Sequence, residues 1–230
     1  CRWSSLLLDS LHLLAGHSQF HSYYIQPPAI GKQVDSAKVL SRSGLNTLMF
    51  TDPYAKLCYT AHLTSQFDRV IYIDLDTTFT AYFNAGFMHT NSIIDIYLPS
   101  EGRLAAMTKD VLESMGDSSL VIFDSVNSFY NLFPIRQRMG SLNHLLSVLI
   151  MLLVRRGVDV NVPVLATSML RYRKEGGWVQ SPASRRLLQH KSAVKLSIDW
   201  HKSDLVLKIV QHQSIEAGTI FVYKCNPIIV

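Results

Sequence analysis

The sequence predicts an α/β domain in which helices cover both faces of a mostly parallel sheet. Short runs rich in apolar and β-branched residues alternate with segments of helical period, which is typical of such a sheet. Hydrophobic residues make up 48% of the chain and charged residues 17%, a composition that supports a large core. The length of 230 residues suits a single domain. We therefore predict one three-layer αβα domain, closed by antiparallel strands near its C-terminal end.

The predicted domain has three parts. Residues 1–43 comprise a leucine-rich amphipathic helix over 1–15 and an irregular segment that Pro27, Pro28 and Gly31 interrupt. Residues 44–200 form the core, and residues 201–230 hold the C-terminal strands. No linker or internal repeat divides the chain.

The first half of the core begins with an apolar run and continues with alternating elements. The run VIYID (70–74) is β-branched and reads as a buried strand. The segment 103–115 is amphipathic and stops at Gly116, a natural end for a helix. In chain order we expect a strand at 45–50, a helix at 56–63, a strand at 70–74, a helix at 81–88, a strand at 92–98 and a helix at 103–115.

The second half continues the alternation. The run LVIFD (120–124) predicts another buried strand, and a long helix over 140–156 is closed by Gly157. Arg155 and Arg156 stand in its last turn, where cations suit the helix dipole. The remaining expected strands lie at 162–167, 193–198, 204–211 and 218–224.

The net charge, the cysteine spacing and the length of the apolar runs limit the classes of function that fit this sequence. The net charge of +5 permits an acidic partner such as nucleic acid without requiring one. The three cysteines lie far apart and show no metal-binding spacing, which favours a reducing, cytoplasmic setting. The longest apolar run, 145–154, is half the length of a membrane span of about 20 residues. We therefore expect neither a membrane segment nor a metal site.

The segment after the first core strand has one feature of a phosphate-binding loop. Such a loop needs glycines, so that its backbone amides can surround phosphates, a lysine, and a Ser or Thr hydroxyl for magnesium. The segment reads TDPYAKLC (51–58), and Lys56 supplies the lysine. Thr51 stands near the place of the first glycine, Ala55 replaces the second, and Leu57 replaces the hydroxyl residue. Lys56 alone is equally consistent with an ordinary basic residue at the start of a helix.

Three aspartates end two of the predicted strands. Asp124 ends LVIFD and is followed by Ser125, a pattern in which a strand-terminal aspartate orients a magnesium-bound water. Asp74 and Asp76 end VIYID, and Asp76 is a candidate general base for an attacking water. The alternative is that Asp74 and Asp76 cap the following turn through local hydrogen bonds.

These motifs resemble the RecA/RadA-type ATPase superfamily. Residues 70–80 (VIYIDLDTTFT) resemble a recombinase strand with its carboxylate, and Asp76 falls on the family's catalytic glutamate. Residues 120–128 (LVIFDSVNS) resemble its Walker B strand, 136–153 its Arg-Gln and leucine-rich helix, and 162–169 the strand that normally ends in Thr-Asn-Gln. Ser168 and Met169 stand where that Asn and Gln belong. The likeness covers residues 44–200 and implies a RecA-like fold with doubtful ATPase function.

The resemblance implies a pseudo-ATPase that serves as an accessory subunit, as recombinase paralogues do. It also implies assembly with RecA-fold subunits, as homo- or hetero-oligomers. One alternative is an Elongator-like RecA-fold scaffold that binds tRNA or protein. Another is a weak ATPase that has rebuilt its phosphate site from Lys56, Asp76 and Asp124. We expect no cofactor in the first two cases, and ATP with magnesium in the third.

A basic segment with aromatic residues follows the 162–167 strand. Its candidate nucleic-acid-binding residues are Arg171, Arg173, Lys174, Trp178, Arg185 and Arg186. Basic side chains contact phosphates and aromatic rings stack on bases, so the segment predicts a loop that binds single-stranded DNA or RNA. In the family that the chain resembles, the equivalent loop faces the bound strand. The alternative is a solvated basic loop that contacts a protein.

Overall fold

The computed structural model describes residues 36–88, 90–133, 138–174, 178–182, 187–188 and 192–224, with the main chain alone for 172–174, 178–182 and 224. The strands are β1 (Leu45–Phe50), β2 (Arg69–Asp74), β3 (Ile93–Tyr97), β4 (Leu120–Asp124), β5 (Val164–Lys174), β6 (Trp178–Pro182), β7 (Ser192–His201), β8 (Asp204–Gln211) and β9 (Ile220–Lys224). The α-helices are α2 (Pro53–Thr64), α3 (Thr78–Asn84), α4 (Leu104–Ser114), α5 (Val126–Phe129) and α6 (Met139–Asp159). The predicted helix over residues 1–15 lies outside the described residues.

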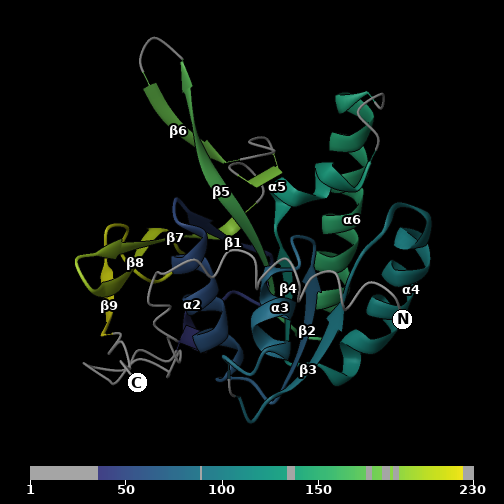
Figure 1. Ribbon diagram of the computed structural model, residues 1–230, viewed down its shortest axis with the longest axis horizontal. Coiled ribbons are helices and arrows are strands. Elements are labelled where there is room, and N and C mark those ends of the chain that lie inside the picture. The colour runs from purple at the N-terminus through teal and green to yellow at the C-terminus, as the bar shows by residue number, and fades with distance from the viewer. Residues whose placement is uncertain are drawn as a thin grey trace, which may run out of the picture.

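The strands form one mixed sheet. Its order is β3-β2-β4-β5-β1-β7-β8-β9, and β6 pairs with β5 alone. The pairs from β3 to β7 are parallel, whereas β7–β8, β8–β9 and β5–β6 are antiparallel. The predicted α/β class with antiparallel C-terminal strands is therefore confirmed (Figure 1).

Helices cover both faces of the sheet because successive strand residues point to opposite sides. In β2, Val70 and Tyr72 join a hydrophobic cluster with α2 and α3. Ile71 and Ile73 join a second cluster with α4, α5 and α6. Parallel strands buried on both faces need runs without polar alternation, which explains why VIYID and LVIFD are so uniformly apolar.

Helices α2 and α6 differ from the prediction at one end. Helix α2 begins at Pro53 rather than at Lys56, because Asp52 caps its first turn and proline is well tolerated at a first helical position. Helix α6 continues through Gly157 to Asp159. A Cβ at Gly157 would lie 2.6 Å from the Val162 carbonyl oxygen, so this glycine permits close packing against the following loop.

The strand predicted at 162–167 is longer in the structure. β5 runs from Val164 to Lys174 and pairs with β6 in an antiparallel hairpin. The hairpin projects beyond the edge of the parallel sheet (Figure 1). Much of the basic segment interpreted as a loop is therefore strand, so its successive positions belong to alternate faces of the hairpin.

Among the described residues, α6 is the one helix long and apolar enough to cross a membrane. One side of it packs in the core through Leu146, Leu149 and Leu153. A buried core helix shares this length and composition with a membrane span.

Candidate functional site

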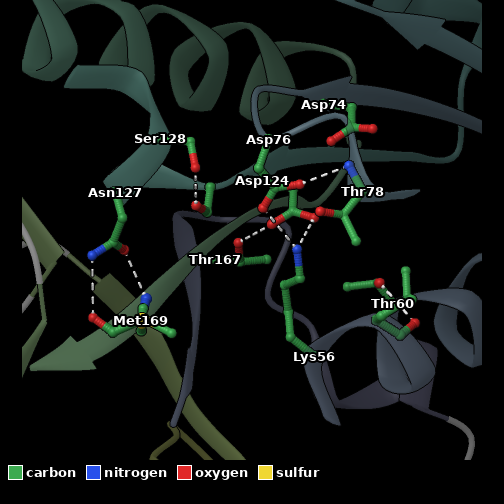
Figure 2. A network of polar contacts seen from close by, with 12 residues as sticks. Lys56, Thr60, Asp74, Asp76, Thr78, Asp124, Asn127, Ser128, Thr167 and Met169 are labelled. Atoms are coloured by element: carbon green, nitrogen blue, oxygen red, sulfur yellow. Dashed lines mark hydrogen bonds and ion pairs between the residues drawn. The ribbon is translucent and has the colours of Figure 1, made fainter. Parts of the chain in front are cut away.

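The candidate site lies at the carboxyl ends of β2 and β4, beside the first turns of α2. In doubly wound sheets the strand ends form the edge where ligands bind. Parallel pairing places Asp74 of β2 opposite Asp124 of β4. Lys56 reaches Asp124 from α2, and Thr167 reaches Asp124 from β5 (Figure 2).

Lys56 is buried and bridges two of the aspartates. Its Nζ lies 2.7 Å from Oδ2 of Asp124 and 3.1 Å from Oδ2 of Asp76. The lysine is 1% exposed, Asp124 is fully buried, and Asp76 is 26% exposed. A buried ammonium is stable only when its charge is paired, and here two carboxylates pair it.

Asp124 receives two further hydrogen bonds. The Tyr72 hydroxyl donates to Oδ2 at 2.5 Å, and the Thr167 hydroxyl donates to Oδ1 at 2.5 Å. Burial and the neighbouring Asp124 charge raise the pKa of Tyr72 well above its ordinary value, so this hydroxyl stays protonated as a donor. Both oxygens of Asp124 are thus occupied by protein donors.

The ion pairs shift the proton affinities of their partners. Burial acts to lower the pKa of Lys56, but the Asp124 and Asp76 carboxylates raise it above its ordinary value. Burial acts to raise the pKa of Asp76, yet the Lys56 charge and the Thr78 backbone N–H lower it below its ordinary value. Lys56 and Asp76 are therefore both charged at neutral pH.

Asp74 has a different environment. Its Oδ2 accepts hydrogen bonds from the Thr80 N–H at 2.8 Å and the Thr80 hydroxyl at 2.6 Å. Its Oδ1 is buried and receives no donor from the part of the chain that the structure describes. Burial raises the pKa of Asp74 to about 6, against the lowering effect of the Thr80 hydrogen bonds. A contact with the Asp76 carboxyl becomes a hydrogen bond only when Asp74 carries a proton.

Asp74 and Asp76 also cap α3, as the local alternative predicted. The Thr80 N–H bonds to Asp74, and the Thr78 N–H donates to Oδ1 of Asp76 at 3.1 Å. Two amides of the first turn of α3 are satisfied in this way. The capping helps to explain why α3 begins at Thr78 rather than at the predicted residue 81.

The N-terminus of α2 is occupied by a carboxylate of the chain itself. Oδ1 of Asp52 accepts hydrogen bonds from the Tyr54 N–H at 2.6 Å and the Ala55 N–H at 2.9 Å. Pro53, the first helical residue, has no N–H to offer. Amides at a helix start normally attract phosphate, but here Asp52 already takes two of them and adds a negative charge.

The residues fit a magnesium-nucleotide poorly. Carboxylate oxygens of Asp74, Asp76 and Asp124 lie within 4.8 Å of one another, and such oxygens are suitable cation ligands. However, the Lys56 ammonium already occupies one oxygen of Asp76 and one of Asp124. The residue after Lys56 is Leu57, which is buried and offers no hydroxyl to a metal.

The other predicted site residues lie elsewhere. The Thr51 hydroxyl donates to Oδ2 of Asp199 on β7 at 2.6 Å, so the Thr51 side chain contacts β7. Arg171 is exposed on β5, and Arg173, Lys174 and Trp178 occupy hairpin positions. Arg185 and Arg186 lie outside the described residues.

Sequence reasoning missed Asp52, Tyr72, Thr167 and Asn127. An Asp-Pro pair before a helical pattern signals a capped helix start, so Asp52 could have been identified. The other three lie 52, 43 and 42 positions from the residues they bond, measured along the chain. No local pattern predicts such contacts.

Comparison with known proteins agrees with this architecture. No family model and no curated protein sequence matches the chain. Among solved structures, the chain is similar to one described as the crystal structure of the RadB recombinase, with a TM-score of 0.59 and 16% sequence identity. The match covers 84% of this chain and 93% of that one. At this identity the likeness establishes the fold alone, and the chain has a RecA-like fold.

Proposed function

We propose that this protein is a RecA-fold pseudo-ATPase, a cytoplasmic accessory subunit that associates with nucleic acid. The observation that carries the first part is the pairing of Lys56 with Asp124 and Asp76. The lysine expected to bind phosphate is held inside the protein by the carboxylates expected to serve the reaction.

The α2 N-terminus supports the same proposal. ATP would have to displace the Asp52 carboxylate from the Tyr54 and Ala55 amides and also draw Lys56 away from two ion pairs. Breaking a buried ion pair costs about 3–5 kcal/mol. That cost opposes nucleotide binding before any phosphate contact forms.

Thermal unfolding with and without ATP and magnesium tests this part. A ligand that binds the native state raises the melting temperature by mass action. We expect no shift at millimolar ATP with magnesium, relative to magnesium chloride alone. A clear rise that requires both ATP and magnesium would support the alternative of a weak ATPase instead.

The projecting β5–β6 hairpin supports the nucleic-acid part. Register pairs Arg171 with Ser181, Arg173 with Val179 and Lys174 with Trp178. Alternation places Arg171 and Arg173 on one face of the hairpin and the positions of Lys174 and Trp178 on the other. Cationic residues for phosphates and an aromatic residue for base stacking therefore share a two-stranded arm.

Titration of labelled single-stranded DNA and RNA at two salt concentrations tests this part. We expect binding that weakens with salt and is lost when Arg171, Arg173 and Lys174 are together changed to Glu. The matched control changes Arg103, Arg155 and Lys208 to Glu, three exposed cations outside the hairpin. Equal loss in both triple variants would leave only a general charge effect and overturn the hairpin assignment.

A second candidate function is that of a scaffold without a nucleic-acid role. It is favoured by an apolar groove of about 710 Å³ between α4 and α6, lined by residues that include Leu104, Leu112, Leu145 and Leu152. Exposed apolar surfaces of this kind commonly bind a protein, a membrane or a ligand, and the scaffold candidate assigns this groove to a protein. We propose that a second copy of this chain occupies the groove. Sedimentation of the wild type and of Leu152→Glu tests this association. A monomer in both cases would remove the support for this candidate.

A further inference from the structure

The hairpin begins where β5 loses its neighbours in the parallel sheet. On one side β5 pairs with β1 as far as Met169, opposite Phe50. On the other side the pairing with β4 stops three residues earlier, at Ala166 opposite Phe123. From Leu170 onwards β5 pairs only with β6. Backbone groups of residues 167–169 on the β4 side therefore need partners other than a strand.

Asn127 supplies such a partner. It lies in α5, three residues after the end of β4. Its Oδ1 accepts hydrogen bonds from the Met169 N–H at 2.7 Å and from the Ser168 hydroxyl at 3.2 Å. Its Nδ2 donates to the Met169 carbonyl oxygen at 3.4 Å. A side-chain amide carries the same donor and acceptor as a peptide group, so Asn127 continues the β4 side of the ladder by one rung (Figure 2).

A second anchor lies two residues before Met169 on β5. The Thr167 hydroxyl donates to Asp124, which Lys56 and Tyr72 also hold. Asp124, the last residue of β4, and Asn127, three residues later in α5, thus fasten neighbouring parts of β5. Both anchors lie immediately before the hairpin leaves the sheet.

We propose that Asn127 is a positioning residue that fixes the direction in which the β5–β6 hairpin leaves the sheet. Thr167 acts with it by joining the base of the hairpin to the ion-paired site. Lys56 in turn holds Asp124 at 2.7 Å, so the base of the hairpin is connected through Thr167 to the ion-paired site. The identity of what the hairpin binds rests on the proposed function, whereas its orientation does not.

Hydrogen exchange of the hairpin amides, residues 170–174 and 178–181, tests the proposal. In Asn127→Ala we expect these amides to exchange about tenfold faster, because the base of the hairpin loses its anchor. Amides of β2 and β4 should exchange as in wild type. Asn127→Asp keeps the acceptor for the Met169 N–H and should restore most of the protection. The control is Asn91→Ala. Asn91 is exposed and precedes β3, an edge strand that β2 and β4 separate from β5.

Unchanged hairpin exchange in Asn127→Ala, or an equal increase in β2 and β4, would overturn the positioning role. Binding of single-stranded DNA and RNA to the same variants separates this role from the proposed function. If wild type binds neither polymer while the exchange effect appears, the positioning role stands and the nucleic-acid proposal fails. If Asn127→Ala binds and exchanges like wild type, the positioning role fails and the nucleic-acid proposal survives.

Discussion

Asp74 and Asp124 occupy matching positions at the ends of neighbouring strands, yet their carboxyl groups receive different donors. They pair in register on β2 and β4, and both are buried. Asp124 receives Lys56, Tyr72 and Thr167, so both of its oxygens have donors. Asp74 receives only Thr80, at one oxygen, and its other oxygen has no donor.

The difference shows that two buried carboxyl groups can differ in how well their oxygens are supplied with donors. Asp124 receives Lys56 and two hydroxyl donors, so each of its oxygens has a partner. Asp74 has too few donors, so burial dominates and raises its pKa to about 6. The carboxyl edge of the sheet therefore holds two different aspartates. Asp124 has a partner at each oxygen, whereas the ionised form of Asp74 destabilises the folded state at neutral pH.

Removal of the cation should have the largest effect. Lys56→Met leaves Asp124 and Asp76 as unpaired carboxylates, and we expect a loss of about 3–5 kcal/mol in the free energy of unfolding. Chemical denaturation measures it. Lys109→Met is the control, since the exposed Lys109–Glu113 pair at 3.8 Å should contribute about 0–0.5 kcal/mol. A loss in Lys56→Met as small as in the control would contradict the assigned ion pairs.

Removal of the Asp74 charge should instead increase the free energy of unfolding. Asp74→Asn eliminates a buried ionisable group while an oxygen remains for Thr80, and we expect a gain of about 1–3 kcal/mol at pH 7. The raised pKa means that the folded state holds the Asp74 proton more tightly than the unfolded state. Wild-type stability from this group is thus fully present below about pH 4 and is lost as pH rises through about 6.

The pH dependence gives this prediction its check. The stability difference between Asp74→Asn and wild type should grow from pH 4 to pH 7 and then level off. Denaturation midpoints across that range measure it. A difference that stays constant with pH would mean that Asp74 is ionised throughout and that its second oxygen has a donor.

The smallest expected effect concerns Asp52, a carboxylate that caps a helix at a partly exposed position. Asp52→Ala removes the acceptor for the Tyr54 and Ala55 amides and should cost about 1 kcal/mol. Asp52→Ser, which keeps an acceptor, should cost less. Thermal melts of the two variants compare them, and equal costs would show that the side-chain oxygen does not act as the cap.

Much of the fold could be predicted because its signals are local. VIYID and LVIFD are short, continuous apolar runs typical of buried strands, and the leucine-rich α6 has helical periodicity. The order of these elements implies a parallel sheet. Boundaries were less accurate at α2 and α6. The cap at Asp52 and the tight packing at Gly157 depend on how neighbouring groups meet, and a glycine can end a helix or permit close approach.

The sequence predicted the charged residues of the candidate site, but not the ion pairs and hydrogen bonds that join them. Lys56, Asp76 and Asp124 follow from strand ends and from a lysine near a helix start. Their pairing with one another depends on side chains that meet across α2, β2 and β4. The hairpin also escaped prediction, because a basic segment with few apolar residues lacks the alternation that marks a half-buried strand.

The sequence by itself determined the α/β class, the order of its elements and the residues that gather at the carboxyl edge of the sheet. Local periodicity and the rules of parallel strand connection are sufficient for these. Only the tertiary structure decided that Lys56 is bound inside the protein, that Asp74 keeps an uncompensated oxygen and that Asn127 holds the base of the hairpin. Charge pairing and hydrogen bonding depend on distances of a few ångströms between residues far apart in the chain, and folding alone sets those distances.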